Sequence, residues 1–118
     1  MLKLQDGYTG TSTTPSLVFV SNHSEPINVL AVEPSSGDWG DADAAVLTVE
    51  VNPDPKREVW NTLYQDGVAV TLEATNNMAA FTLNGGVHCR LVGNDTANTS
   101  LNLWVGGNGI TLPSGEAT

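Results

Sequence analysis

The chain has 118 residues, of which 40% are hydrophobic, and 13 Asp and Glu against four Lys and Arg give a net charge of −9. This length predicts one domain with one hydrophobic core. The acidic excess repels phosphate backbones and anionic lipid headgroups, which excludes nucleic acid and membrane surfaces as partners. No apolar run reaches the roughly 20 residues that span a bilayer, and residues 1–6 lack the apolar segment of a secretory signal. We therefore expect a protein made in the cytoplasm and not exported through a signal peptide.

The first fifteen residues are rich in Gly, Thr and Ser, and this composition is poorly suited to burying a face. We predict an extended N-terminal arm over residues 1–15, a β-sandwich domain over 16–112 and a flexible C-terminal tail over 113–118. From Ser16 onward, short β-rich runs alternate with turn signals at the spacing typical of a sandwich. About eight strands are expected, with a ninth short one at the end: Leu17–Ser21, Ile27–Glu33, Ala44–Val51, Glu58–Leu63, Val68–Thr75, Ala79–Leu83, Val87–Val92, Ser100–Val105 and Ile110–Leu112.

Alternation of apolar and polar residues predicts which side chains face the core, because successive strand residues point to opposite sides. Most runs alternate and predict one buried face. Leu17–Val20 and Ile27–Val32 are apolar at almost every position, which indicates central strands or strands covered by a partner. The Asn84-Gly85 pair is the strongest hairpin signal.

Reactive residues are few. His23 lies in a predicted turn and His88 on a predicted strand, with no nucleophile motif around either one. Cys89 is the single cysteine, so the chain has no internal disulfide. Its position in the alternation of apolar and polar residues favours a core side chain over a reactive thiol. A typical zinc site needs three or four Cys and His ligands. The chain has three such residues, and two of them, His88 and Cys89, are adjacent with side chains on opposite faces, which excludes structural zinc. The composition favours a protein without catalytic residues or cofactors.

One glycine-containing loop carries three carboxylates, at Asp38, Asp41 and Asp43. Such a loop provides oxygen ligands of the kind that Ca²⁺ prefers, although it lacks the EF-hand spacing. The alternative is a solvated acidic loop.

Trp39, Trp60 and Trp104 fall outside the predicted core positions. Exposed tryptophans stack on sugars or anchor protein interfaces. The alternative is that sheet twist or a covering loop buries each ring.

The segment from Ala44 to Val105 resembles a family of small β-sandwich proteins from tailed-phage particles. The resemblance rests on strands and turns in a fixed order: Ala45–Val51, Asn52-Pro53-Asp54-Pro55, Val59-Trp60, Gly67–Leu72, Phe81-Thr82-Leu83, a Gly-Gly turn, Val87–Gly93 and Ser100–Val105. Pro55 stands where Gly is more typical of the family. The resemblance implies a jelly-roll-like fold and no catalytic residues.

The implied function is capsid decoration, in which the protein binds the outer head shell after synthesis in the host cytoplasm and stabilises it through the arm and sheet edges. The expected partners are the major capsid protein and further copies of the chain, as a dimer or trimer. Alternatives are a carbohydrate-binding module and a fibre or tail connector. We expect the binding residues among Leu2, Leu4, Tyr8, Val18, Val20, Trp39, Trp60 and Trp104.

Overall fold

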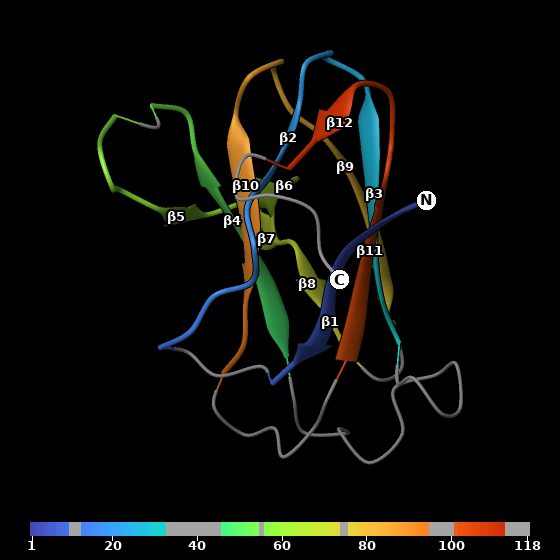
Figure 1. Cartoon of the computed structure of the whole chain (residues 1–118). Coiled ribbons are helices and arrows are strands. Elements are labelled where there is room, and N and C mark those ends of the chain that lie inside the picture. Colours follow the sequence, from blue (N-terminus) through green and yellow to red (C-terminus); the bar gives the residue numbers. More distant parts are fainter. Residues whose placement is uncertain (10–12, 33–45, 55, 74–75, 95–100, 113–118) are drawn as a thin grey trace.

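The computed structural model describes residues 1–9, 13–32, 46–54, 56–73, 76–94 and 101–112. Every regular element in these residues is a β-strand, and the strands that pair do so antiparallel. Two main sheets pack face to face, as Figure 1 shows. The predicted all-β antiparallel sandwich is therefore confirmed.

The smaller of the two main sheets has four strands. Its order is β1 (Leu2–Tyr8), β11 (Leu101–Gly106), β3 (Pro26–Val32) and β9 (Met78–Thr82). The central strand β3 pairs over five positions with β11 and over five with β9, without a register shift. Its apolar sequence thus reflects a central position, one of the two interpretations that the sequence left open.

The larger sheet has β10 (His88–Val92) and β4 (Leu47–Asn52) at its centre. On one side of β10 lie β2 (Phe19–Ser21) and β12 (Ile110–Thr111). On the far side of β4 lie β5 (Asn61–Thr62) and β8 (Thr71–Leu72). A separate hairpin joins β6 (Tyr64–Gln65) to β7 (Val68–Ala69).

The edge strand beside β4 is made from two separated pieces of chain. At Val49 the N–H donates to the Val70 carbonyl and the carbonyl accepts from the Leu63 N–H, both at 2.9 Å. The Val70 N–H donates to the Leu63 carbonyl, also at 2.9 Å, and closes the gap between the pieces. The β6–β7 hairpin is therefore an excursion from one edge strand, turning at Asp66 (φ 54°) and Gly67 (φ 79°).

Between the main sheets lies one apolar core. Its fully buried side chains alternate along β3, β4, β10 and β11, as the sequence predicted for Leu47, Val49, Cys89, Leu91, Leu101, Leu103 and Val105. The chain changes sheet at almost every connection, which agrees with the jelly-roll-like expectation. Each predicted strand corresponds to an observed one within its described residues, although Glu58–Leu63 shrinks to two residues and Val68–Thr75 divides in two.

The predicted arm is wrong for residues 2–8. They form β1, which pairs with β11 through two register shifts, and Leu4 and Tyr8 are buried in the core. The shifts are bulge-like irregularities, which adapt an imperfectly alternating sequence to a sheet. Gln5 accepts a 2.8 Å hydrogen bond from the Leu17 N–H, and the Tyr8 hydroxyl accepts one of 3.1 Å from the Gly93 N–H. The domain therefore begins at residue 2, while the predicted tail over 113–118 lies outside the described residues.

The predicted hairpin at Asn84-Gly85 is also corrected. A turn forms there, but it connects β9 in the smaller sheet to β10 in the larger one. Gly85 packs so closely on the Asn22 backbone that a Cβ would lie 2.9 Å from its carbonyl oxygen. This glycine serves a crossing between the sheets, with Gly86 taking the positive φ of 89°.

Candidate binding surfaces

The predicted binding residues separate into buried and accessible groups. Leu4, Tyr8 and Val20 are buried in the domain, so they are not available to a partner in the folded chain. Leu2 is 38% exposed, and Val18, just before β2, is half-buried. Trp39 lies outside the described residues, as do Asp38, Asp41 and Asp43 of the predicted calcium loop.

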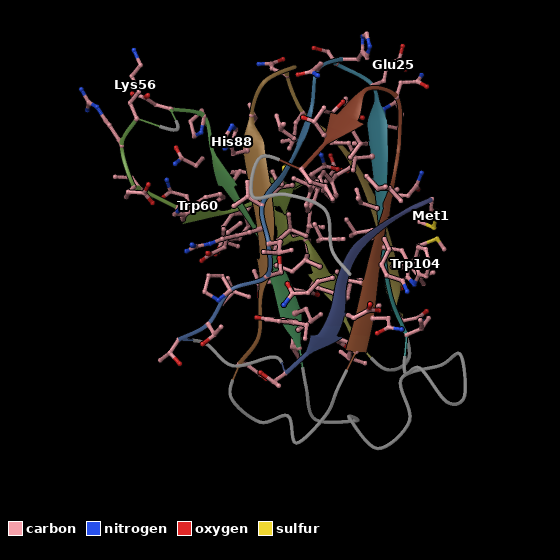
Figure 2. All side chains as sticks on the ribbon, viewed as in Figure 1. Met1, Glu25, Lys56, Trp60, His88 and Trp104 are labelled. Atoms are coloured by element: carbon pink, nitrogen blue, oxygen red, sulfur yellow. The ribbon has the colours of Figure 1, made fainter. Side chains whose placement is uncertain are left out.

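Trp60 and Trp104 lie on opposite outer faces of the sandwich (Figure 2). Trp104 is on β11, between the core residues Leu103 and Val105, so its ring points away from the core, and it is half-buried. Its position on the polar side of the alternation was visible in the sequence. Trp104 is therefore on the outer face of the smaller sheet, where part of its ring is accessible.

A row of four side chains crosses the outer face of the smaller sheet. Lys3, Trp104, Leu30 and Met78 are successive cross-strand partners on β1, β11, β3 and β9. The Lys3 ammonium lies 5.0 Å from the Trp104 ring centre, which is a cation–π distance. Met78 is 48% exposed at the far end of the row. We call these four residues the Trp104 row.

The described cross-strand partners next to this row are uncharged. The neighbouring cross-strand partners are Asn102 with Val32 on one side and Gly106, Asn28 and Ala80 on the other. Lys3 forms an ion pair with Asp6 at 3.1 Å. The surface around Trp104 is therefore mainly apolar and neutral, in a chain whose net charge is −9.

Trp60 occupies a different environment on the larger sheet. The Arg90 guanidinium lies 4.2 Å from its ring centre, and the Arg90 Nε donates to the Glu50 Oε1 at 2.8 Å. The Trp60 Nε1 is buried and has no hydrogen-bond partner among the described residues. Because the guanidinium covers one face of this ring, Trp60 is a poorer stacking platform for a sugar than the sequence suggested.

The loop that follows β4 folds back onto Asn52, the last residue of that strand. The Asn52 side chain is buried, donates to the Arg57 carbonyl at 2.9 Å and accepts from the Asp54 N–H at 3.0 Å. An Asx-type hydrogen bond thus holds the start of the loop, at Asn52-Pro53-Asp54. A shallow hollow of about 240 Å³ lies between this loop and Val59.

At one end of the sandwich lies a hollow that the sequence did not predict. It has a volume of about 470 Å³ and is lined by Met1, Leu2, Val105 and Ile110 together with glycines. Its lining residues come from both ends of the described chain, and no local pattern in the sequence indicates that they meet. Leu2, which lines this hollow, is 38% exposed, whereas Leu4, two residues later, is fully buried.

Reactive side chains are not gathered anywhere in the described residues. No three of His, Cys, Asp and Glu lie close enough there to hold a metal ion. Burial raises the pKa of the Cys89 thiol from its usual 9.0 to about 12, so the thiol keeps its proton near neutrality. No helix among the described residues is long and apolar enough to cross a membrane.

Comparisons with known protein families, with curated proteins and with solved structures return no match. The candidate surfaces are therefore interpreted from the chemistry of this chain alone.

Proposed function

We propose that the chain is a structural protein of a tailed-phage particle, which binds the outer head shell as a decoration protein and stabilises contacts between major capsid subunits. The observation that carries the proposal is the neutral, apolar outer face around the Trp104 row. An interface core is depleted of charge and enriched in aromatic residues and Met. This face has that composition, whereas the chain as a whole is acidic.

The route of attachment differs from the one that the sequence suggested. Because residues 2–8 complete the smaller sheet, they are unavailable as a free arm. We propose instead that the face around Trp104 docks on the capsid subunit, with Trp104 and Leu30 as anchors. Remaining acidic surface would keep the protein soluble and separate neighbouring decoration proteins.

The test is co-sedimentation with expanded and unexpanded capsid shells of the parent phage. We expect the wild-type chain to sediment with expanded shells and Trp104→Ala to bind at least tenfold more weakly, since a central aromatic anchor is lost. Val92→Ala is the matched control, because Val92 is half-buried on the outer side of the other sheet, and it should bind like wild type.

Thermal unfolding of both variants verifies that they are folded. Failure of the wild-type chain to bind either kind of shell would refute the proposal. A glycan array separates the carbohydrate-binding alternative, since specific glycan binding that Trp104→Ala abolishes would support that function in place of decoration.

A further inference from the structure

The chain has two Asn-Gly pairs, Asn84-Gly85 and Asn108-Gly109, and both lie in exposed segments between strands. An asparagine amide is lost most readily when glycine follows, because glycine has no side chain to keep its nitrogen away from the amide carbon. On sequence alone the two pairs are equivalent. In the fold they differ at the main-chain N–H of the glycine.

At Asn84-Gly85 the glycine nitrogen is held in place. The Gly85 N–H donates to the Ser24 Oγ at 3.1 Å, and the following N–H, of Gly86, donates to the Ser21 carbonyl at 2.8 Å. The Gly85 nitrogen can approach the Asn84 amide only after these hydrogen bonds break. The fold therefore protects this pair, in the way that local structure protects other main-chain groups from reaction.

At Asn108-Gly109 the contacts hold the carbonyl groups and leave the glycine nitrogen free. The Asn108 carbonyl accepts from the Ser21 Oγ at 3.0 Å, and the Gly109 carbonyl accepts from the Asn22 N–H at 3.2 Å. No group among the described residues accepts a hydrogen bond from the Gly109 N–H. The Asn108 Nδ2 donates to the carboxylate of Glu25, which Figure 2 shows at the upper end of the sandwich.

The fold also requires this reactive pair. Gly109 has a positive φ of 64°, and a Cβ there would lie 2.5 Å from the Cδ2 of His23, so a larger residue does not fit. An aspartate in place of Asn108 would set a second carboxylate against Glu25. Glycine at 109 and an amide at 108 therefore both suit the turn.

We propose that Asn108 is a site of spontaneous deamidation. The Gly109 nitrogen loses its proton to hydroxide and bonds to the Asn108 Cγ, and the Cγ–Nδ2 bond breaks. Nδ2 takes a proton from water and leaves as ammonia. Water then opens the succinimide ring at either of its carbonyl carbons, which gives aspartate or isoaspartate. The reaction consumes water, releases ammonia and needs no oxidant, reductant or enzyme.

This modification changes the connection that leads into β12. The new carboxylate replaces the amide donor beside Glu25, so like charges replace a hydrogen bond. In the isoaspartate product the main chain also runs through the former side-chain carbon, which lengthens it by a methylene group. Because β12 pairs with β2 only at Ile110 with Ser21 and at Thr111 with Val20, a longer and repelled connection should loosen it.

The first test incubates the full chain at mildly alkaline pH and measures the deamidation of each asparagine by peptide mass spectrometry. In the folded chain we expect Asn108 to react at least about tenfold faster than Asn84, because local opening must precede the reaction at Asn84. In concentrated urea the two rates should converge, since glycine follows both residues. Ser24→Ala removes the acceptor of the Gly85 N–H, so it should speed the reaction at Asn84 and leave that at Asn108 unchanged.

The second test measures the effect on β12. The deamidated chain gains a negative charge, so anion exchange separates it from the unmodified chain. Main-chain hydrogen exchange in β12 should be at least about tenfold faster in this fraction. Asn108→Gln is the control, because it keeps an amide and forms the corresponding larger ring far more slowly. After the same incubation its β12 should exchange like that of the fresh wild-type chain.

Equal rates at Asn84 and Asn108 in the folded chain would overturn the inference, and so would an Asn108 that reacts only in urea. Unchanged hydrogen exchange of β12 in the deamidated fraction would overturn the proposed effect on this strand. These experiments use isolated protein, so their outcome does not depend on binding to shells.

Discussion

At the scale of single residues, Arg90 and Cys89 show how burial changes the role of a polar group. Arg90 and Glu50 are cross-strand partners on β10 and β4, with side chains about one-fifth exposed. Arg90 also covers the Trp60 ring, so one guanidinium links the sheet to the loop before β5. Cys89, the next residue toward the N-terminus, points into the core and acts as a small apolar side chain.

We predict that Arg90→Ala lowers the free energy of unfolding by about 1–3 kcal/mol, because it removes a charge-assisted hydrogen bond and a cation–π contact. Urea unfolding measures the loss. Arg57→Ala is the control, since its ion pair with Asp54 is exposed and should contribute under about 1 kcal/mol. Equal losses in the two variants would contradict the structural role of Arg90.

For Cys89 we predict a loss of stability at alkaline pH. The unfolded thiol releases its proton from about pH 9, whereas the folded thiol holds it to about pH 12. Between these values the folded state binds more protons, so the free energy of unfolding falls as pH rises, by up to about 1.4 kcal/mol per pH unit. Urea unfolding at successive pH values from 8 to about 11 measures this slope.

Cys89→Val provides the comparison, because it keeps an apolar side chain and has no proton to lose. Its stability should fall less steeply over the same pH window. If the two proteins show parallel profiles, ionisation of Cys89 does not contribute to the alkaline loss.

At the scale of elements, β1 forms one edge of the smaller sheet, and the divided strand made of β5 and β8 forms one edge of the larger sheet. Strand β1 completes the smaller sheet and contributes Leu4 and Tyr8 to the core. The β6–β7 hairpin interrupts the edge strand beside β4 and leaves two pieces of two residues each. The register shifts distort β1, and the hairpin shortens the strand beside β4. Strand β9, in contrast, pairs with β3 without a register shift.

We predict that Leu4→Ala destabilises the domain by about 2–5 kcal/mol, as expected for a fully buried leucine. Leu2→Ala, at a 38% exposed position on the same strand, should cost much less. Thermal or urea unfolding of the two variants checks this order. A similar small loss in both would indicate that residues 1–8 behave as an arm after all.

At the scale of the whole molecule, the two outer faces differ in chemistry. The larger sheet displays Arg90, Glu50 and His88, while the smaller sheet displays the Trp104 row beside uncharged neighbours. With a net charge of −9, the neutral face is the part of the described surface best suited to a protein partner. The proposed binding to the head shell rests on this asymmetry.

The amino-acid sequence determined the fold class, most strand positions and most of the core, because a period of two along a strand is a local property. It also placed Trp104 outside the core. Tertiary structure decided that residues 2–8 belong to a sheet, that Asn84-Gly85 crosses between sheets and that β9 is the last strand of the smaller sheet. These features depend on pairing between segments far apart in the chain, such as β1 with β11, and no local pattern specifies such a partner.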